Sequence, residues 1–288
     1  MGQWMGIENS TVDGAIPVVR VRPPQAWNGF VWREMWDRRE LVVALVKRDI
    51  QIRYRQTVAG VLWVLGQPIV TTIVLSLLLM RLTGSSQAGV PYPLFVFVAL
   101  IVWGYLNHAL TRATVCFVEH SQLVQRVYLP RLILPFATVV AALADFFLAF
   151  AVLPFLLLWF QVMPSWAILA LPLVIGLMIV TVFALGLWLA LFNAEFRDIA
   201  FALPFLLQIG MFVSPIFYSS EIVPLPWRWV YALNPIVGIV EGMRWTLLNP
   251  TTPPPLLLMW ISFFSTCIIL FIGLYVFQRR EPMLADVI

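Results

Sequence analysis

The chain has 288 residues, of which 61% are hydrophobic and only 11% are charged, and its mean hydropathy is +0.92. This composition excludes an ordinary soluble protein and predicts an all-α, polytopic membrane protein. The net charge of +4 comes from cations at the borders of apolar segments, so nucleic acid is not an expected partner.

The segment before the first long apolar stretch divides into two parts. Residues 1–26 contain no apolar core of signal-peptide length, so we expect a cytoplasmic N-terminal segment. Residues 27–59 alternate apolar and charged side chains at helical spacing, which predicts amphipathic helices lying at the membrane interface. A plain basic flank that only orients the first span would explain the charges, but not Trp27 and Trp36.

Six apolar segments are long enough to cross a bilayer as helices, which takes about 20 residues. They lie at residues 60–80, 93–115, 132–160, 167–192, 199–218 and 255–277. Together they form an expected transmembrane domain at residues 60–278, with a cytoplasmic tail at 279–288.

The distribution of Lys and Arg predicts the orientation of these spans. Fifteen of the 18 cations fall before the first span, at the second and fourth connections, or in the tail. The densest group, between Lys47 and Gln56, directly precedes the first span. Because short loops rich in Lys and Arg stay inside, both termini are predicted to be cytoplasmic.

The second connection, residues 117–130, is predicted to form a short cytoplasmic helix that ends at Pro130. Its apolar residues recur at helical spacing and share one face. That face could pack under the bundle of its own chain, or it could be presented to a soluble partner. The residues concerned are Leu123, Val124, Val127 and Tyr128.

Residues 220–250 are too interrupted by proline for two crossings and too apolar for an ordinary loop. We expect an outer re-entrant helical hairpin between spans five and six. Asn234-Pro235 suits the start of its second helix, because Asn caps free amides and Pro is tolerated at the first helical position. Irregular backbone at membrane depth must be covered by protein or line a cavity, so the hairpin is expected to line something.

Asp145 is the one acidic residue well inside a predicted span, and a buried charge in a bilayer is costly. It could take part in ion or proton coupling, pair with Arg112, or hydrogen-bond at a subunit contact. His108, in the second span, has no second His or Cys at ligand spacing, so no metal site is expected.

The sequence lacks the motifs of hydrolytic enzymes and of ATP-binding loops. A Walker loop requires Gly-Lys-Ser/Thr, and the only lysine, Lys47, follows Val46. We therefore expect no catalytic residue and no cofactor in this chain. If transport is driven by ATP, another subunit must bind the nucleotide and its Mg²⁺.

Aromatic residues make up 14% of the chain and include 13 tryptophans. Rings at the headgroup level or packed in the core are one explanation. Rings that face a pore are the other, since sugars pack their C–H faces against flat rings. The rings within or at the ends of spans are Trp63, Trp103, Tyr105, Phe212, Phe217 and Tyr218.

Three groups of residues occur in an order that resembles one known family. The first runs from Lys47 to Trp63 and continues with Gln67-Pro68, and the second is Phe196-Arg197-Asp198. The third group comprises Ser214-Pro215-Ile216-Phe217-Tyr218, Leu233-Asn234-Pro235 and Arg244. Together they resemble the ABC-2 type permeases that export bacterial surface polysaccharides, and the resemblance covers roughly residues 30–278.

The resemblance implies a homodimer of six-span subunits in the bacterial inner membrane, with two copies of an ABC ATP-binding subunit below it. The implied substrate is a lipid-linked O-antigen. Teichoic acid, capsule or a drug would be the alternative cargo, and a membrane-embedded enzyme acting on lipid-linked sugars is an alternative function.

The resemblance also implies roles for individual residues. Residues at the implied lipid-phosphate entrance are Lys47, Arg48, Arg53, Tyr54 and Arg55. Residues implied in coupling to the ATPase are Glu119, Leu123, Val124, Val127, Tyr128, Phe196, Arg197 and Asp198. Residues of the implied outer gate are Trp227, Trp229, Tyr231, Asn234, Pro235 and Arg244.

Overall fold

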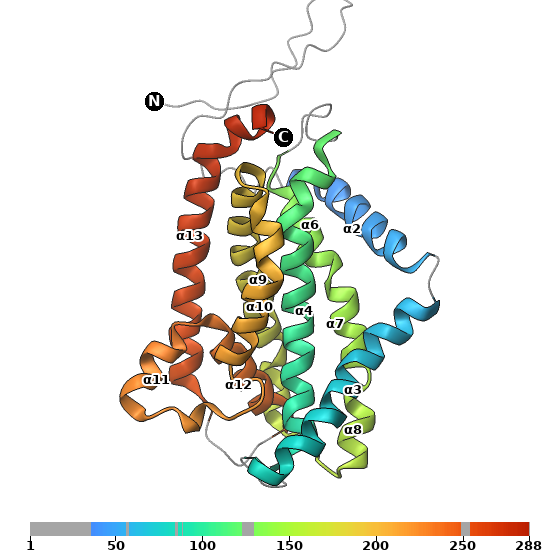
Figure 1. The fold of residues 1–288 in the computed structure, drawn as a ribbon, viewed down its shortest axis with the longest axis vertical. Helices are drawn as coiled ribbons and strands as arrows, with labels where there is room; N and C mark the ends of the chain where they lie inside the picture. Colours follow the sequence, from blue (N-terminus) through green and yellow to red (C-terminus); the bar gives the residue numbers. More distant parts are fainter. Residues whose placement is uncertain are drawn as a thin grey trace, which may run out of the picture.

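A computed structural model describes the chain as a bundle of long helices with a small antiparallel hairpin of β1 (Ser86–Gln87) and β2 (Val90–Pro91) (Figure 1). The segment expected at residues 1–26, residues 27–35 of the interfacial segment, and residues 123–129 of the helix expected at 117–130 lie outside the described residues. The described residues are 36–55, 58–83, 86–87, 89–122, 130–248 and 254–287.

Two long helices form the centre of the bundle. α4 (Tyr92–Glu119) is buried along most of its length, and it packs against α9 (Leu171–Glu195). Small residues let the two helices approach closely, since a Cβ added to Gly186 would lie 3.1 Å from the Cβ of Ala113. Apolar residues therefore surround α4 on nearly all sides, as expected of a helix in the middle of a bundle.

The third predicted span is a continuous apolar segment that consists of three short helices. These pieces are α6 (Ile133–Ala141), α7 (Leu143–Phe150) and α8 (Leu153–Trp159). At the first break the amide of Asp145 donates to the carbonyl of Ala142, three residues back, which tightens the turn. The break sets the direction in which α7 presents Asp145.

Four apolar helical stretches are long enough to cross a membrane, so this is a multi-pass membrane protein. They are Tyr92–Glu119, Ile133–Trp159, Trp166–Glu195, which joins the short η1 (Trp166–Ala170) to α9, and Leu256–Glu281 in α13 (Leu256–Val287). Two further predicted spans coincide with shorter apolar stretches, Leu62–Leu78 in α3 (Val58–Thr83) and α10 (Asp198–Val213). Crossing by these two helices remains a prediction. α13 also continues as a helix through the residues expected to form the tail.

The basic segment before the first span forms α2 (Arg39–Tyr54), which leans obliquely on the side of the bundle (Figure 1). It packs mainly against α6, with Leu45 buried in the contact, and its C-terminal end approaches α3. One helix is thus present in the described part of the interfacial segment. Its charged residues lie on both sides, since Arg39 and Lys47 are exposed, whereas Arg48 and Arg53 reach the bundle.

Residues 220–250, which are expected to lie on the outer side and are called the outer segment below, contain two short helices. These are α11 (Leu225–Ala232) and α12 (Pro235–Leu248), and they follow a 3₁₀ turn η2 (Ser220–Ile222). The side-chain oxygen of Asn234 accepts a hydrogen bond of 3.1 Å from the amide of Ile236, which confirms the predicted helix start. α12 is largely buried and packs against α13, α9 and α4. Entry of this pair into the membrane remains a prediction.

A glycine allows α12 and α13 to touch. A Cβ at Gly238 would lie 2.5 Å from Oγ of Ser262 and 2.7 Å from the carbonyl oxygen of Leu258. The amide of Gly238 also donates to Ser262 Oγ at 3.0 Å. The position therefore has no room for a methyl group unless the two helices separate.

We expect Gly238→Ala to destabilise the protein by about 1–3 kcal/mol, the usual cost of overpacking a tight contact. The measurement is thermal unfolding of the purified chain in detergent. Gly176→Ala on α9 is the matched control, because a Cβ there meets nothing within 4 Å. Equal unfolding temperatures for the two variants would contradict the close contact.

Candidate functional site

The C-terminal end of α2 brings two side chains to Asp145. Nη2 of Arg53 lies 2.6 Å from Oδ2 of Asp145, and the hydroxyl of Tyr54 donates to Oδ1 of the same carboxylate. His108, from the middle of α4, places its Nδ1 2.9 Å from Oδ2. Residues from α2, α4 and α7 thus meet at one carboxylate, which we call the Asp145 cluster.

The partners of His108 determine where its ring carries a proton. Nη1 of Arg53 donates to Nε2 of His108, so Nε2 must be the acceptor nitrogen. The proton of a neutral imidazole is then on Nδ1, which lies 2.9 Å from Oδ2 of Asp145 but forms no hydrogen bond to it.

The cluster compensates the cost of burying a carboxylate. Only 10% of the Asp145 side chain is exposed, against 38% of the Arg53 side chain. A buried charge is tolerated when its lone pairs are met by donors, and here Arg53 and Tyr54 supply them, with His108 close by. Burial, followed by the hydrogen bond to Asp145, raises the pKa of Tyr54 to about 12, so its hydroxyl remains a donor at neutral pH.

A second contact of the same kind ties α2 to the end of α4. Nη2 of Arg48 contacts Nε2 of His120, whose Nδ1 donates to the carbonyl of Cys116 at 2.8 Å. The same Nη2 lies 2.9 Å from Oδ1 of Asp49. Of the two histidines of the chain, His108 is on α4 and His120 caps the C-terminal end of this helix, and each accepts from an arginine of α2.

The structure rejects one alternative for Asp145 and supports a structural pairing. Arg112 pairs with Glu119 on its own helix, at 3.0 Å, and not with Asp145. The reason is geometric: residues 112 and 119 lie two turns apart on the same face of α4, while Asp145 faces α4 one turn earlier, at His108. Sequence reasoning missed the pairing with Arg53 because no local pattern relates residues 53 and 145.

The implied coupling residues are described only in part. Leu123, Val124, Val127 and Tyr128 lie outside the described residues. Glu119 is the last residue of α4. Phe196, Arg197 and Asp198 form the corner between α9 and α10, and 62% of Phe196 is exposed there. The corner is fixed by Asn193, whose side-chain oxygen accepts from the amide of Ala200 at 3.1 Å. Asn193 was not a predicted site residue; a polar residue at the end of an apolar span was the only signal for it.

The six candidate pore aromatics differ in burial, and two of them, Phe217 and Tyr218, are half-buried. Trp103 and Tyr105 are buried in the chain itself, and the Tyr105 hydroxyl donates to the carbonyl of Val139 at 3.2 Å. Packing, the alternative interpretation, accounts for these two. Trp63 on α3 and Phe212 on α10 are exposed at the surface of the chain.

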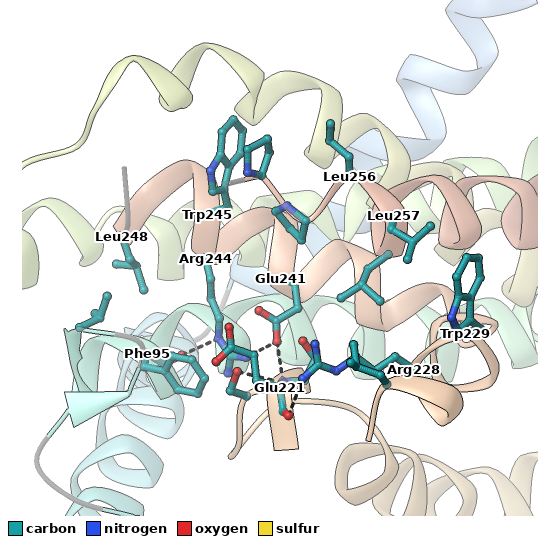
Figure 2. A pocket seen from close by; sticks show the side chains of 17 residues that line it. Phe95, Glu221, Arg228, Trp229, Glu241, Arg244, Trp245, Leu248, Leu256 and Leu257 are labelled. Atoms are coloured by element: carbon teal, nitrogen blue, oxygen red, sulfur yellow. Dashed lines mark hydrogen bonds and ion pairs between the residues drawn. The ribbon is translucent and has the colours of Figure 1, made fainter. Parts of the chain in front are cut away.

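The outer segment holds a second polar centre, around Arg244 (Figure 2). Arg244 is buried, yet its guanidinium donates to the carbonyls of Phe95 at 3.2 Å and Ile216 at 2.9 Å. A third, longer bond of 3.4 Å reaches the carbonyl of Tyr218, and the guanidinium carbon lies 3.4 Å from the centre of the Phe95 ring. Glu241, one helical turn earlier and 3.4 Å away, supplies the counter-charge.

Further hydrogen bonds hold the segment 214–218, which follows α10. The side-chain amide of Asn234 donates to Ser214 Oγ at 3.1 Å, and the Tyr92 hydroxyl donates to the carbonyl of Phe217 at 3.0 Å. Tyr231 donates to the hydroxyl of Tyr218 at 3.0 Å. Several outer-gate candidates therefore act together on this one segment.

A cavity of about 410 Å³ opens beside Arg244, between the outer helices and the start of α13 (Figure 2). Arg228 crosses its edge and donates to the carbonyls of Val223 at 2.8 Å and Glu221 at 2.6 Å. Of the predicted tryptophans, Trp229 lines the cavity, whereas Trp227 is exposed outside its lining. Among the residues that the structure describes, no group of three or more His, Cys, Asp or Glu side chains could hold a metal ion.

Comparison with known proteins agrees with the multi-pass helical fold. A family model described as ABC-2 type transporter matches residues 40–248. The chain is 26% identical over 257 residues to the O-antigen export system permease protein RfbA of Myxococcus xanthus, covering 88% of this chain and 97% of that protein. It is also 21% identical over 254 residues to the protein of the same name from Klebsiella pneumoniae, covering 86% and 95% respectively.

We expect Arg244→Ala to destabilise the protein by about 3–5 kcal/mol, because it leaves Glu241 and several carbonyls without their partner. Thermal unfolding measures the loss, and hydrogen exchange of residues 214–218 should rise with it. The control is Arg279→Ala, since Arg279 also lies over an aromatic ring, Tyr275, but is exposed. Similar losses in both variants would contradict this role of Arg244.

Proposed function

Because this chain belongs to the ABC-2 type transporter family, we propose that it is the membrane subunit of an ATP-driven exporter of lipid-linked O-antigen. Permeases named for O-antigen export align with it over nearly their full length, which supports this cargo. The structural observation that carries the proposal is the docking of α2, whose arginines reach α4 and α7 beside the predicted first span.

The proposed assembly is a homodimer of six-span subunits in the inner membrane, with both termini cytoplasmic. α3 and α10, the two shorter apolar helices, expose large apolar side chains that a second copy or lipid can cover. A path for the glycan between two copies would use the exposed rings Trp63 and Phe212. The buried Trp103 and Tyr105 would pack behind the residues that line this path.

Two copies of an ABC ATP-binding subunit would bind Mg-ATP below the membrane. The corner between α9 and α10 and the C-terminal end of α4 lie at the same end of the bundle (Figure 1). Phe196 protrudes from this corner in an extended conformation, which suits insertion into a partner's surface. We propose that Phe196, Arg197 and Asp198 contact the ATPase there.

We also propose that Arg48, Arg53 and Arg55 hold the phosphate of the lipid carrier. This role is tested by replacing all three arginines with Ala. We expect surface glycan export to fall about tenfold or more, because hydrogen bonds to charged groups contribute about 1.5–3 kcal/mol each. Export is measured as O-antigen on whole cells, with membrane insertion and ATPase association checked in the same strains. Arg39→Ala, at the other end of α2, should preserve export. Unaltered export by the assembled triple variant would remove the phosphate role.

Coupling is tested by Phe196→Asp, which places a charge where an apolar partner surface is expected. The variant should insert normally but lose co-purification with the co-expressed ATP-binding subunit. Ile222→Asp is the matched control, because Ile222 is exposed to a similar degree (64%) in the outer segment. Intact co-purification of the Phe196 variant would count against the corner as a docking point, and glycan export without any ATPase would count against the transporter itself.

A further inference from the structure

The carboxylate of Asp145 occupies the position that a phosphate oxygen would need at Arg53. Nη2 of Arg53 lies 2.6 Å from Oδ2 of Asp145, and Arg53 is among the cations proposed above to hold a lipid phosphate. A guanidinium presents the same planar set of donors to a carboxylate and to a phosphate. The two anions therefore compete for one side chain.

The two partners differ in their freedom to move. Asp145 is fixed on α7 and is 10% exposed, whereas the long side chain of Arg53 extends from α2 and is 38% exposed. α2 itself lies at the side of the bundle (Figure 1). Arg53 can therefore turn toward a headgroup by changing rotamer, while the carboxylate stays in place.

Asp145 keeps hydrogen-bond donors when Arg53 turns away. The hydroxyl of Tyr54 donates to Oδ1, and Nδ1 of His108 lies 2.9 Å from Oδ2, although it forms no hydrogen bond while Arg53 is in place. A buried carboxylate stripped of every donor would be strongly unfavourable, so the Tyr54 hydroxyl and the nearby imidazole make the exchange of Arg53 feasible. The geometry provides both a resting partner for Arg53 and a substitute for it at Asp145.

On the basis of the proposed function, we propose that Asp145 is an internal counter-ion that competes with the phosphate of the lipid carrier for Arg53. Asp145 does not touch the lipid; it is a positioning residue that sets how tightly Arg53 holds the headgroup. The competition speeds release, since Arg53 returns to Asp145 as the lipid moves on. A transport site needs this balance, because a substrate bound too tightly does not leave.

The test uses the complete complex with its ATP-binding partner in nanodiscs of neutral phosphatidylcholine. The probe is a polyprenyl diphosphate without glycan. We expect Asp145→Asn to bind this lipid about fivefold more tightly and to release it more slowly, because the competing charge is gone. In export assays, the apparent KM and the turnover rate should both fall.

Matched variants separate this role from a general effect of charge. In Arg53→Gln/Asp145→Asn the gain in affinity should disappear. Glu195→Gln also removes a carboxylate from an arginine, Arg280, and should leave the affinity unchanged. Tyr54→Phe should weaken binding, since Asp145 then depends more on Arg53; this opposite effect tests the inference even if the Asp145 variant fails to assemble.

The two layers of the proposal fail in different ways. Unchanged lipid binding by Arg53→Gln alone would remove the proposed phosphate role of α2. If Arg53→Gln weakens lipid binding but Asp145→Asn leaves it unchanged or weaker, only the competition between Asp145 and phosphate is overturned. Tighter lipid binding by Tyr54→Phe would also overturn the competition. Inorganic pyrophosphate should displace the lipid only at much higher concentration; equal affinity would identify free diphosphate as the ligand and overturn the lipid assignment.

Discussion

A charged side chain buried among apolar helices has no water around it, so each buried charge must be met by other groups of the protein. Asp145 and Arg244 obey this constraint, and each gathers several segments in doing so. Asp145 draws α2 and α4 onto α7, while Arg244 draws α4 and residues 214–218 onto α12. α4 takes part in both centres, through His108 and through the carbonyl of Phe95. The central helix is thus the common frame to which the inner and outer elements are attached.

The two centres differ in how their partners are attached. Arg244 is held mainly by backbone carbonyls, which move only when the chain moves, so its segment is fixed as a unit. Arg53 is held by side chains, which exchange partners through rotamer changes. The first arrangement suits a permanent brace and the second suits a reversible contact. The same rule of compensating a buried charge therefore yields one rigid and one exchangeable connection.

Hydropathy and local patterns predicted the helical class, the positions of the long apolar helices and the start of α12 at Asn234-Pro235. These features depend on neighbours in sequence, where composition and capping act directly. The contact between Arg53 and Asp145 depends on how α2 leans against the bundle, and no local pattern encodes that angle. The same limitation produced the wrong partner for Asp145, since Arg112 is satisfied on its own helix by Glu119.

Aromatic residues show the same division. Trp103 and Trp63 both lie in apolar sequence segments, so the sequence could not show that the first is buried and the second exposed before the packing was known. The role of the buried Asn193 could not be predicted for another reason. An asparagine at the end of a span can hydrogen-bond to many groups, and only the geometry of the corner determines that it accepts from the amide of Ala200.

That bond has a mechanical consequence. A corner closed by a side chain that spans from one helix to the next cannot absorb a displacement as a slack loop would. A push delivered at Phe196 would therefore be passed on to α10. The far end of this helix is Ser214, where the chain passes into the segment clamped by Arg244. A displacement at one end of the bundle would thus reach the other end through a single helix.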